Sequence, residues 1–193
     1  SLGLSLLYAF GTPAFFRTGY LNQNLAIAVF AFTAFVLLWN PSGFTSWTVR
    51  RRHLIAGALA GLSFLSDYSG AILMGLLGLY AWWKEGAAGG VGAGFRDALW
   101  YAAGCIPGML MLAQYQYASF GNAFYPPQHW MPPVEWIDIG YQGVGGLSAE
   151  LVWLLLADPR YGLFVTMPVA VLALAGPWLA RQPDSRLPAR EVQ

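Results

Sequence analysis

A single carboxylate, Asp67, lies at the midpoint of an apolar run that extends from Leu54 to Trp83. That run is long enough to cross the roughly 30 Å hydrocarbon core of a bilayer. An ionisable residue at that depth is costly, and by default it faces a protein interior or a water-filled cavity. Asp67 and the adjacent Tyr68 could therefore line a cavity and contact a ligand hydroxyl or a partner arginine. The alternative is a structural role at a helix end or turn, where a carboxylate accepts backbone N–H bonds.

Two further side chains, Arg17 and His129, are candidates for substrate binding. A guanidinium can hold a phosphate through two parallel hydrogen bonds, so Arg17 is either a phosphate ligand or an arginine that snorkels to a membrane interface. His129 precedes Glu135 and Asp138, and these three could bind a divalent metal, act in acid–base chemistry or simply form polar surface. Their spacing matches no standard ligand pattern, so a metal is not indicated and we predict no cofactor.

The amino-acid composition indicates that membrane-spanning helices position these residues. Of the 193 residues, 57% are hydrophobic and only 10% are charged, which is typical of a multi-pass helical membrane protein. The net charge is +1 and no basic patch carries interleaved aromatic residues, so nucleic acid is not a predicted partner. We predict an all-α fold, a polytopic transmembrane helical bundle with a structured external loop. The predicted spans are Leu21–Trp39, Leu54–Trp83, Ala98–Tyr117 and Tyr161–Ala180.

The distribution of charge orients these spans. Basic residues are concentrated in three segments, residues 41–53, 84–97 and 181–193. The positive-inside rule makes these segments cytoplasmic in a protein of the cell inner (plasma) membrane, and it makes residues 118–160 external. Both ends of the second span then lie on the cytoplasmic side. We therefore predict a hairpin of two short helices that turns at Ser66–Gly70, rather than one long tilted helix.

Small residues indicate where the helices pack. The pairs Gly57–Gly61 and Gly104–Gly108 are each spaced by four residues, so they offer flat faces for close helix approach. Packing within one bundle is the expected use, and a dimer seam is the alternative. Cys105 is expected to be a small buried residue. The segment 86–94, which is rich in glycine and alanine, is expected to be a flexible connection.

The external loop 118–160 is too long for a simple connector, and it is rich in proline, glycine and aromatic residues. Ser148 is predicted to cap a short helix over Ala149–Ala157, with Leu147 and Leu151 as a hydrophobic staple. Because this helix is almost wholly apolar, we expect it to lie in the membrane interface.

The sequence begins within an apolar stretch. Ser1–Phe10 is about half the length of a span, and neither an initiator methionine nor a basic leader precedes it. We therefore predict that residues 1–193 form a single transmembrane region that belongs to a longer polypeptide.

Four segments carry a family resemblance. Gly11–Arg17 reads GTPAFFR, Ala56–Leu62 is followed by Asp67-Tyr68, Tyr115–Asn122 ends in SFGN, and Asp158–Phe164 reads DPRYGLF. In this order they resemble the GTP…(Y/F)xR, GLLLGLAVLTxY, YNxxxFGNP and SPxRGLLxYSP segments of bacterial C-type glycosyltransferases. Those multi-spanning enzymes are similar to the protein mannosyltransferases and aminoarabinose transferases, and the likeness covers nearly the whole chain.

The resemblance implies transfer of a sugar from a polyprenyl-phosphate carrier to an acceptor at the external face. It implies a catalytic acid in a first external loop that this chain does not contain. In this family setting Arg17 would bind the carrier phosphate, Asp67 and Tyr68 would line the cavity, and the loop around His129 would close over the acceptor. The implied partners are the bilayer and a polyprenyl-phosphate-linked sugar. Where the family often has an acidic residue or histidine, this chain has Asn22, Gln23 and Asn24.

A second hypothesis comes from a different class of protein. A non-catalytic accessory or scaffold subunit, packed against other membrane subunits, would also have many aromatic residues, glycine faces and an incomplete catalytic set. A transporter is a weaker alternative, because it would normally carry intramembrane charges in more than one span and here only Asp67 qualifies.

Overall fold

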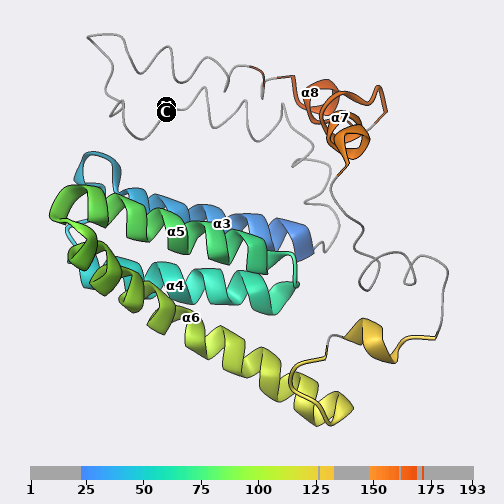
Figure 1. The fold of residues 1–193 in the computed structure, drawn as a ribbon, viewed down its shortest axis with the longest axis horizontal. Helices are drawn as coiled ribbons and strands as arrows, with labels where there is room; N and C mark the ends of the chain where they lie inside the picture. Colours follow the sequence, from blue (N-terminus) through green and yellow to red (C-terminus); the bar gives the residue numbers. More distant parts are fainter. Residues whose placement is uncertain (1–22, 126, 133–147, 161, 169–170, 172–193) are drawn as a thin grey trace. The chain divides into compact units, whose positions relative to one another are not determined.

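Helices account for the regular structure of this chain. The computed structural model describes residues 23–125, 127–132, 148–160, 162–168 and 171, and these ranges contain no strand (Figure 1). The all-α prediction is confirmed for this part of the chain. By its internal contacts the chain divides into two units, Leu21–Val134 and Ser1–Tyr20 with Glu135–Gln193. Among the described helices, none combines the length and the apolar character needed to cross a membrane.

Four long helices form the unit Leu21–Val134. Helix α4 packs against the other three, and α6 also packs against α5. Figure 1 shows α3, α4 and α5 lying side by side with their axes nearly aligned. The elements are α3 Gln23–Trp39, η1 Pro41–Gly43, α4 Val49–Ser66, α5 Gly70–Gly89, α6 Val91–Phe120 and η2 Pro127–Trp130.

Helices α4 and α5 form the predicted hairpin. Helix α4 ends at Ser66 and α5 begins at Gly70, so the turn between them is only three residues long. A β-carbon on Gly70 would overlap the backbone of Ser63. Glycine is therefore required for the chain to turn back this closely, and the prediction of a turn at residues 66–70 is confirmed.

Helices α4 and α6 meet backbone to backbone through the two predicted glycine pairs, Gly57–Gly61 and Gly104–Gly108. A β-carbon on Gly61 would lie 2.8 Å from the carbonyl oxygen of Cys105, and one on Gly104 would overlap the carbonyl of Leu54. No side chain separates the two helices at these points. Small residues allow this approach because they bring the two backbones into van der Waals contact. Packing within one bundle is therefore what these glycines do here.

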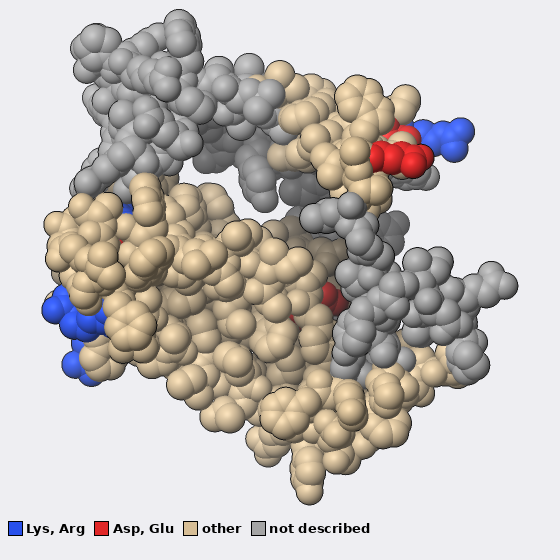
Figure 2. All heavy atoms as spheres, in the orientation of Figure 1, with Lys and Arg blue, Asp and Glu red and all other residues tan. Residues whose placement is uncertain are grey.

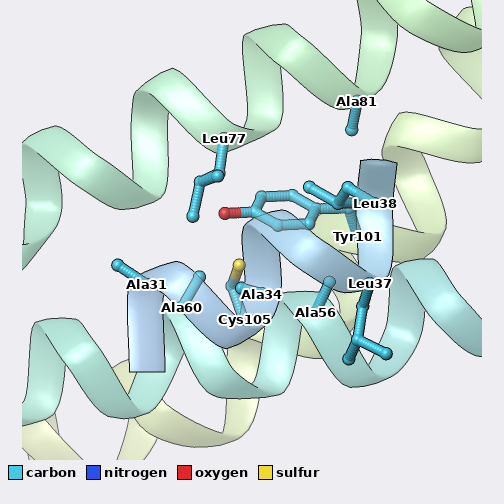
Figure 3. Packing of buried hydrophobic residues seen from close by; sticks show 10 residues of the cluster. All are labelled: Ala31, Ala34, Leu37, Leu38, Ala56, Ala60, Leu77, Ala81, Tyr101 and Cys105. Carbon is cyan, nitrogen blue, oxygen red and sulfur yellow. The ribbon is translucent and has the colours of Figure 1, made fainter. Parts of the chain in front are cut away.

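The core of the bundle is built mainly from small side chains. Half of the ten buried hydrophobic residues in its central cluster are alanines (Figure 3). Tyr101 is the only aromatic residue among the ten, and its hydroxyl donates a hydrogen bond to the carbonyl oxygen of Met74 at 2.8 Å. Cys105 is buried, as expected. The ten residues are Ala31, Ala34, Leu37, Leu38, Ala56, Ala60, Leu77, Ala81, Tyr101 and Cys105.

The prediction of a flexible connection over residues 86–94 is wrong. Helix α5 continues to Gly89 and α6 begins at Val91, so Gly90 alone breaks the helical path, with a φ of 85°. A β-carbon on Gly94 would lie 2.9 Å from the Cα of Gly86. The small residues act as a packing surface, because they let α5 and α6 touch only four residues on either side of Gly90.

The other unit contains two described helices, α7 Ala149–Ala157 and α8 Leu163–Thr166. Helix α7 has the predicted bounds, and the Ser148 hydroxyl accepts a hydrogen bond from the Leu151 backbone N–H at 3.0 Å. This is the predicted N-cap. Leu147, the other half of the predicted staple, lies outside the described residues, as does most of the predicted span 161–180.

Candidate functional site

The Asp67 carboxylate joins the α4–α5 turn to the start of α3. Its Oδ1 accepts the backbone N–H of Ser69 at 2.8 Å, and its Oδ2 accepts the side-chain amide of Gln23 at 2.9 Å. The first bond is the local turn contact that aspartate commonly makes two residues along. The second depends on a residue 44 positions away, at the first turn of α3. The structural role at a turn, one of the two alternatives for Asp67, is therefore present.

Tyr68, the other predicted site residue, contacts α6. Its hydroxyl accepts a hydrogen bond from the side-chain amide of Gln116, which is buried. Its ring packs edge-on against Phe64, with the ring centroids 6.0 Å apart. Tyr68 and Gln116 thus fasten the α4–α5 turn, which also contains Asp67, to the second half of α6.

These four residues, Gln23, Asp67, Tyr68 and Gln116, define what we call the polar end of the bundle. It offers one carboxylate, one phenol and two amides, and the Asp67 and Tyr68 side chains are each half-buried. Carboxylate oxygens accept hydrogen bonds, while phenols and amides can both donate and accept them. Such a set can hold a polyhydroxylated ligand. Among the described residues, no three His, Cys, Asp or Glu side chains come together in a way that could hold a metal ion.

An open apolar groove of about 350 Å³ runs between α3 and α5. Phe32 and Phe35 of α3 face Leu73, Leu76 and Tyr80 of α5 across it. Phe35 and Tyr80 also contact each other, with ring centroids 5.4 Å apart. The groove is lined almost entirely by carbon atoms, so it suits a hydrocarbon ligand.

At the opposite end of the bundle lie the charged residues of segments 50–52, 84–85 and 96–97, and we call this the charged end. Arg52 is buried, and its Nη1 donates to the carbonyl oxygens of Leu37 at 3.2 Å and Leu38 at 3.4 Å. Lys84 of α5 donates to the carbonyl oxygen of Trp39. The last carbonyls of a helix have no partner within it, and a cation also favours that negative end of the dipole. Arg52 and Lys84 therefore cap α3 from two neighbouring helices.

His53 is the most deeply buried titratable residue at this charged end, with 1% of its surface exposed. Its Nδ1 lies 2.9 Å from the Val49 carbonyl oxygen, so Nδ1 carries the proton and donates it. Its Nε2 lies 4.0 Å from Glu85 Oε1 and has no hydrogen-bond partner among the described residues. Burial lowers the pKa of His53, although the Val49 carbonyl and the carboxylates of Glu85 and Asp97 oppose that shift. Burial therefore favours the neutral form of His53.

Sequence reasoning missed this buried polar group because Arg50–His53 looks like an exposed basic run. The helical spacing contains the missing signal: His53 is four residues before Gly57, and Arg52 is four residues before Ala56. Asp97 likewise stands four residues before Tyr101, on the buried face of α6.

The remaining predicted site residues are only partly within the described structure. His129 is exposed in η2, where it stacks on Tyr125 at 4.6 Å between ring centroids and meets Trp130 edge-on at 5.2 Å. Its predicted partners Glu135 and Asp138 lie outside the described residues, as does Arg17.

Comparison with known proteins adds no relative: no family model matches the chain, and neither a curated protein nor a solved structure matches it.

Proposed function

We propose that this chain is the membrane-embedded helical part of a C-type glycosyltransferase, which moves a sugar from a polyprenyl-phosphate carrier to an acceptor at the external face of the inner membrane. The observation that carries the membrane location is the arrangement of side chains by size. Alanine and glycine supply many of the helix contacts, while a large number of bulky apolar side chains are exposed. Soluble proteins rarely leave large contiguous apolar patches exposed, whereas helices in lipid pack through small residues. Outward-facing residues of this kind include Phe32, Ile72, Leu76, Leu79, Leu99, Ile106, Leu110 and Met111.

The sorting of charge supports the same location. Between residues 23 and 132, every Lys, Arg, Asp and Glu other than Asp67 lies in the three short segments 50–52, 84–85 and 96–97. Figure 2 shows the basic side chains gathered at one end of the bundle, beyond a broad surface without charge. An apolar belt with basic residues at one end matches the pattern that the positive-inside rule describes.

The polar end and the apolar groove support the choice of substrate. Beyond their bonds within the protein, the Asp67 carboxylate can accept and the Tyr68 hydroxyl can donate further hydrogen bonds, which are the bonds that sugar hydroxyls make. The α3–α5 groove is suited to an isoprenoid chain. In this proposal Arg17 binds the carrier phosphate and the segment around His129 covers the acceptor. The residue that activates the acceptor hydroxyl as a general base belongs to a loop outside this chain.

The membrane location is tested by extraction. The full-length protein, expressed in bacteria, should stay in the membrane pellet after an alkaline carbonate wash and leave it only with detergent. Recovery in the carbonate supernatant would contradict the proposal.

Carrier binding is tested with the detergent-purified full-length protein. A polyprenyl-phosphate-linked sugar should raise its thermal unfolding midpoint, since a ligand that binds only the native state stabilises it. Asp67→Asn should lose most of that shift, because the amide cannot replace both acceptor oxygens of the carboxylate. Glu85→Gln makes the same chemical change at the opposite end of the bundle and should keep the shift. Equal behaviour of the two variants would remove the polar end from the proposed site.

A further inference from the structure

Two arginines at the charged end, Arg50 and Arg51, lie over tryptophan rings. The Arg50 Cζ is 3.7 Å from the centroid of the Trp100 ring, and the Arg51 Cζ is 4.5 Å from that of Trp47. Trp100 belongs to α6, while Trp47 lies just before the start of α4. Each contact is within the distance at which a guanidinium is attracted to the face of an indole ring.

Neither of these arginines has a carboxylate partner among the described residues, and both are exposed. The other cations of the charged end are engaged. Arg96 pairs with Asp97, at 3.1 Å between Nε and Oδ1, and Arg52 is buried as a cap of α3. Among the described residues, Arg50 and Arg51 are therefore the exposed cations of the charged end that no carboxylate neutralises.

The tryptophan ring lies against one side of each guanidinium, and both arginines remain exposed, so N–H groups stay open to solvent. The N–H edge is the part of arginine that binds a phosphate through two parallel hydrogen bonds. The stacked ring also holds the side chain in one orientation, so less conformational freedom remains to be lost when an anion binds. Exposed aromatic side chains flank the charged residues of this end in the sequence: Trp82 and Trp83 precede Lys84 in α5, and Phe44 follows η1.

We propose that Arg50 and Arg51, each held on its tryptophan, bind the phosphates of anionic phospholipid headgroups in the leaflet that meets the charged end. The partner is a lipid because the phosphate-binding edges occur together with exposed aromatic side chains, which favour the headgroup layer of a bilayer. Charge complementarity specifies an anionic lipid, since juxtamembrane cations are attracted to that surface. This inference rests on the membrane location proposed above and is independent of the glycosyltransferase activity.

The test uses the full-length protein in mixed micelles of a mild detergent with increasing phosphatidylglycerol. The thermal unfolding midpoint should rise with phosphatidylglycerol and stay unchanged with phosphatidylcholine. Each of Arg50→Gln and Arg51→Gln should raise the half-saturating mole fraction about fivefold, and the double variant should lose the shift. Arg96→Gln removes the same charge from a paired arginine and should behave as the wild type.

Three results would overturn the inference: no difference between the two lipids, a double variant that keeps the shift, or an equal shift from inorganic phosphate alone. If the double variant fails to fold, the two single variants decide the matter, because each leaves one stacked arginine in place. Failure of the carbonate extraction test refutes the membrane location itself. Failure of this lipid titration, with that test passed, refutes only the headgroup site.

Discussion

Replacing Gly104 with alanine is the sharpest test of the α4–α6 contact. The new methyl group would lie 2.9 Å from the Ala58 backbone nitrogen and 3.0 Å from the Gly57 Cα, and it would overlap the Leu54 carbonyl. All three obstacles are backbone atoms, so no side-chain rotation can make room and the helices must move apart. Overpacking of this kind costs about 1–3 kcal/mol, and the upper end applies when only backbone can yield. Alanine recovers up to about 1 kcal/mol of helix propensity, so the net loss should be near 2 kcal/mol.

Gly75→Ala is the matched control. Gly75 lies within α5, is exposed, and has nothing within 4 Å of the position of a β-carbon. The same substitution should therefore stabilise the protein by about 0.5–1 kcal/mol through helix propensity alone. The two variants should differ by about 3 kcal/mol, or roughly 6–12 °C in unfolding midpoint for a chain of this length.

Thermal unfolding of the detergent-purified variants, followed by circular dichroism, measures that difference. A double variant, Gly57→Ala with Gly104→Ala, should cost less than the sum of its parts, because the first methyl group already separates the helices. Equal midpoints for Gly104→Ala and Gly75→Ala would refute the close backbone contact.

Three further outcomes follow from single contacts. Because burial lowers the pKa of His53, the unfolded chain binds more protons than the folded one below about pH 6.5, so stability should fall as the pH drops through that value. His53→Gln should flatten this part of the curve of unfolding free energy against pH, and an unchanged slope would contradict the assignment. Arg52→Gln should lower the free energy of unfolding by about 1.5–3 kcal/mol, because a charged hydrogen bond is lost, and the unfolding midpoint should fall clearly. Arg51→Gln should change that free energy by under about 0.5 kcal/mol. Ser148→Ala should cost α7 about 0.5–2 kcal/mol and speed hydrogen exchange at the Leu151 amide, and unchanged exchange there would contradict the cap.

Features set by local sequence could be predicted. The turn at residues 66–70 follows from a polar break in an apolar run, and the α7 cap follows from a serine placed before a helical stretch. The glycine pairs of α4 and α6 could be read as packing faces because their four-residue spacing puts both members of a pair on one side of a helix. The placement of Asp67 in a turn followed from the same polar break.

Features set by distant partners could not be predicted. Gln23 donates to Asp67 and Gln116 donates to Tyr68, but nothing near either glutamine in the sequence indicates its partner. Arg52 looked like one member of an exposed basic run, because its role depends on the end of α3 lying beside it. The segment 86–94 was mistaken for a flexible connection, since its glycines weaken a helix locally and only the contact between two helices compensates.

The central claim is that the polar end serves sugar transfer from a polyprenyl-phosphate carrier. The most direct measurement is the initial rate at which the purified full-length protein releases labelled sugar from such a carrier in mixed micelles, for the wild type, Asp67→Asn and Glu85→Gln. We expect transfer by the wild type and by Glu85→Gln, and at least a tenfold loss for Asp67→Asn, which corresponds to about 1.4 kcal/mol. No transfer by the wild type, together with stoichiometric partner chains that stay bound in mild detergent, would contradict the claim and favour a packing subunit of a larger membrane complex.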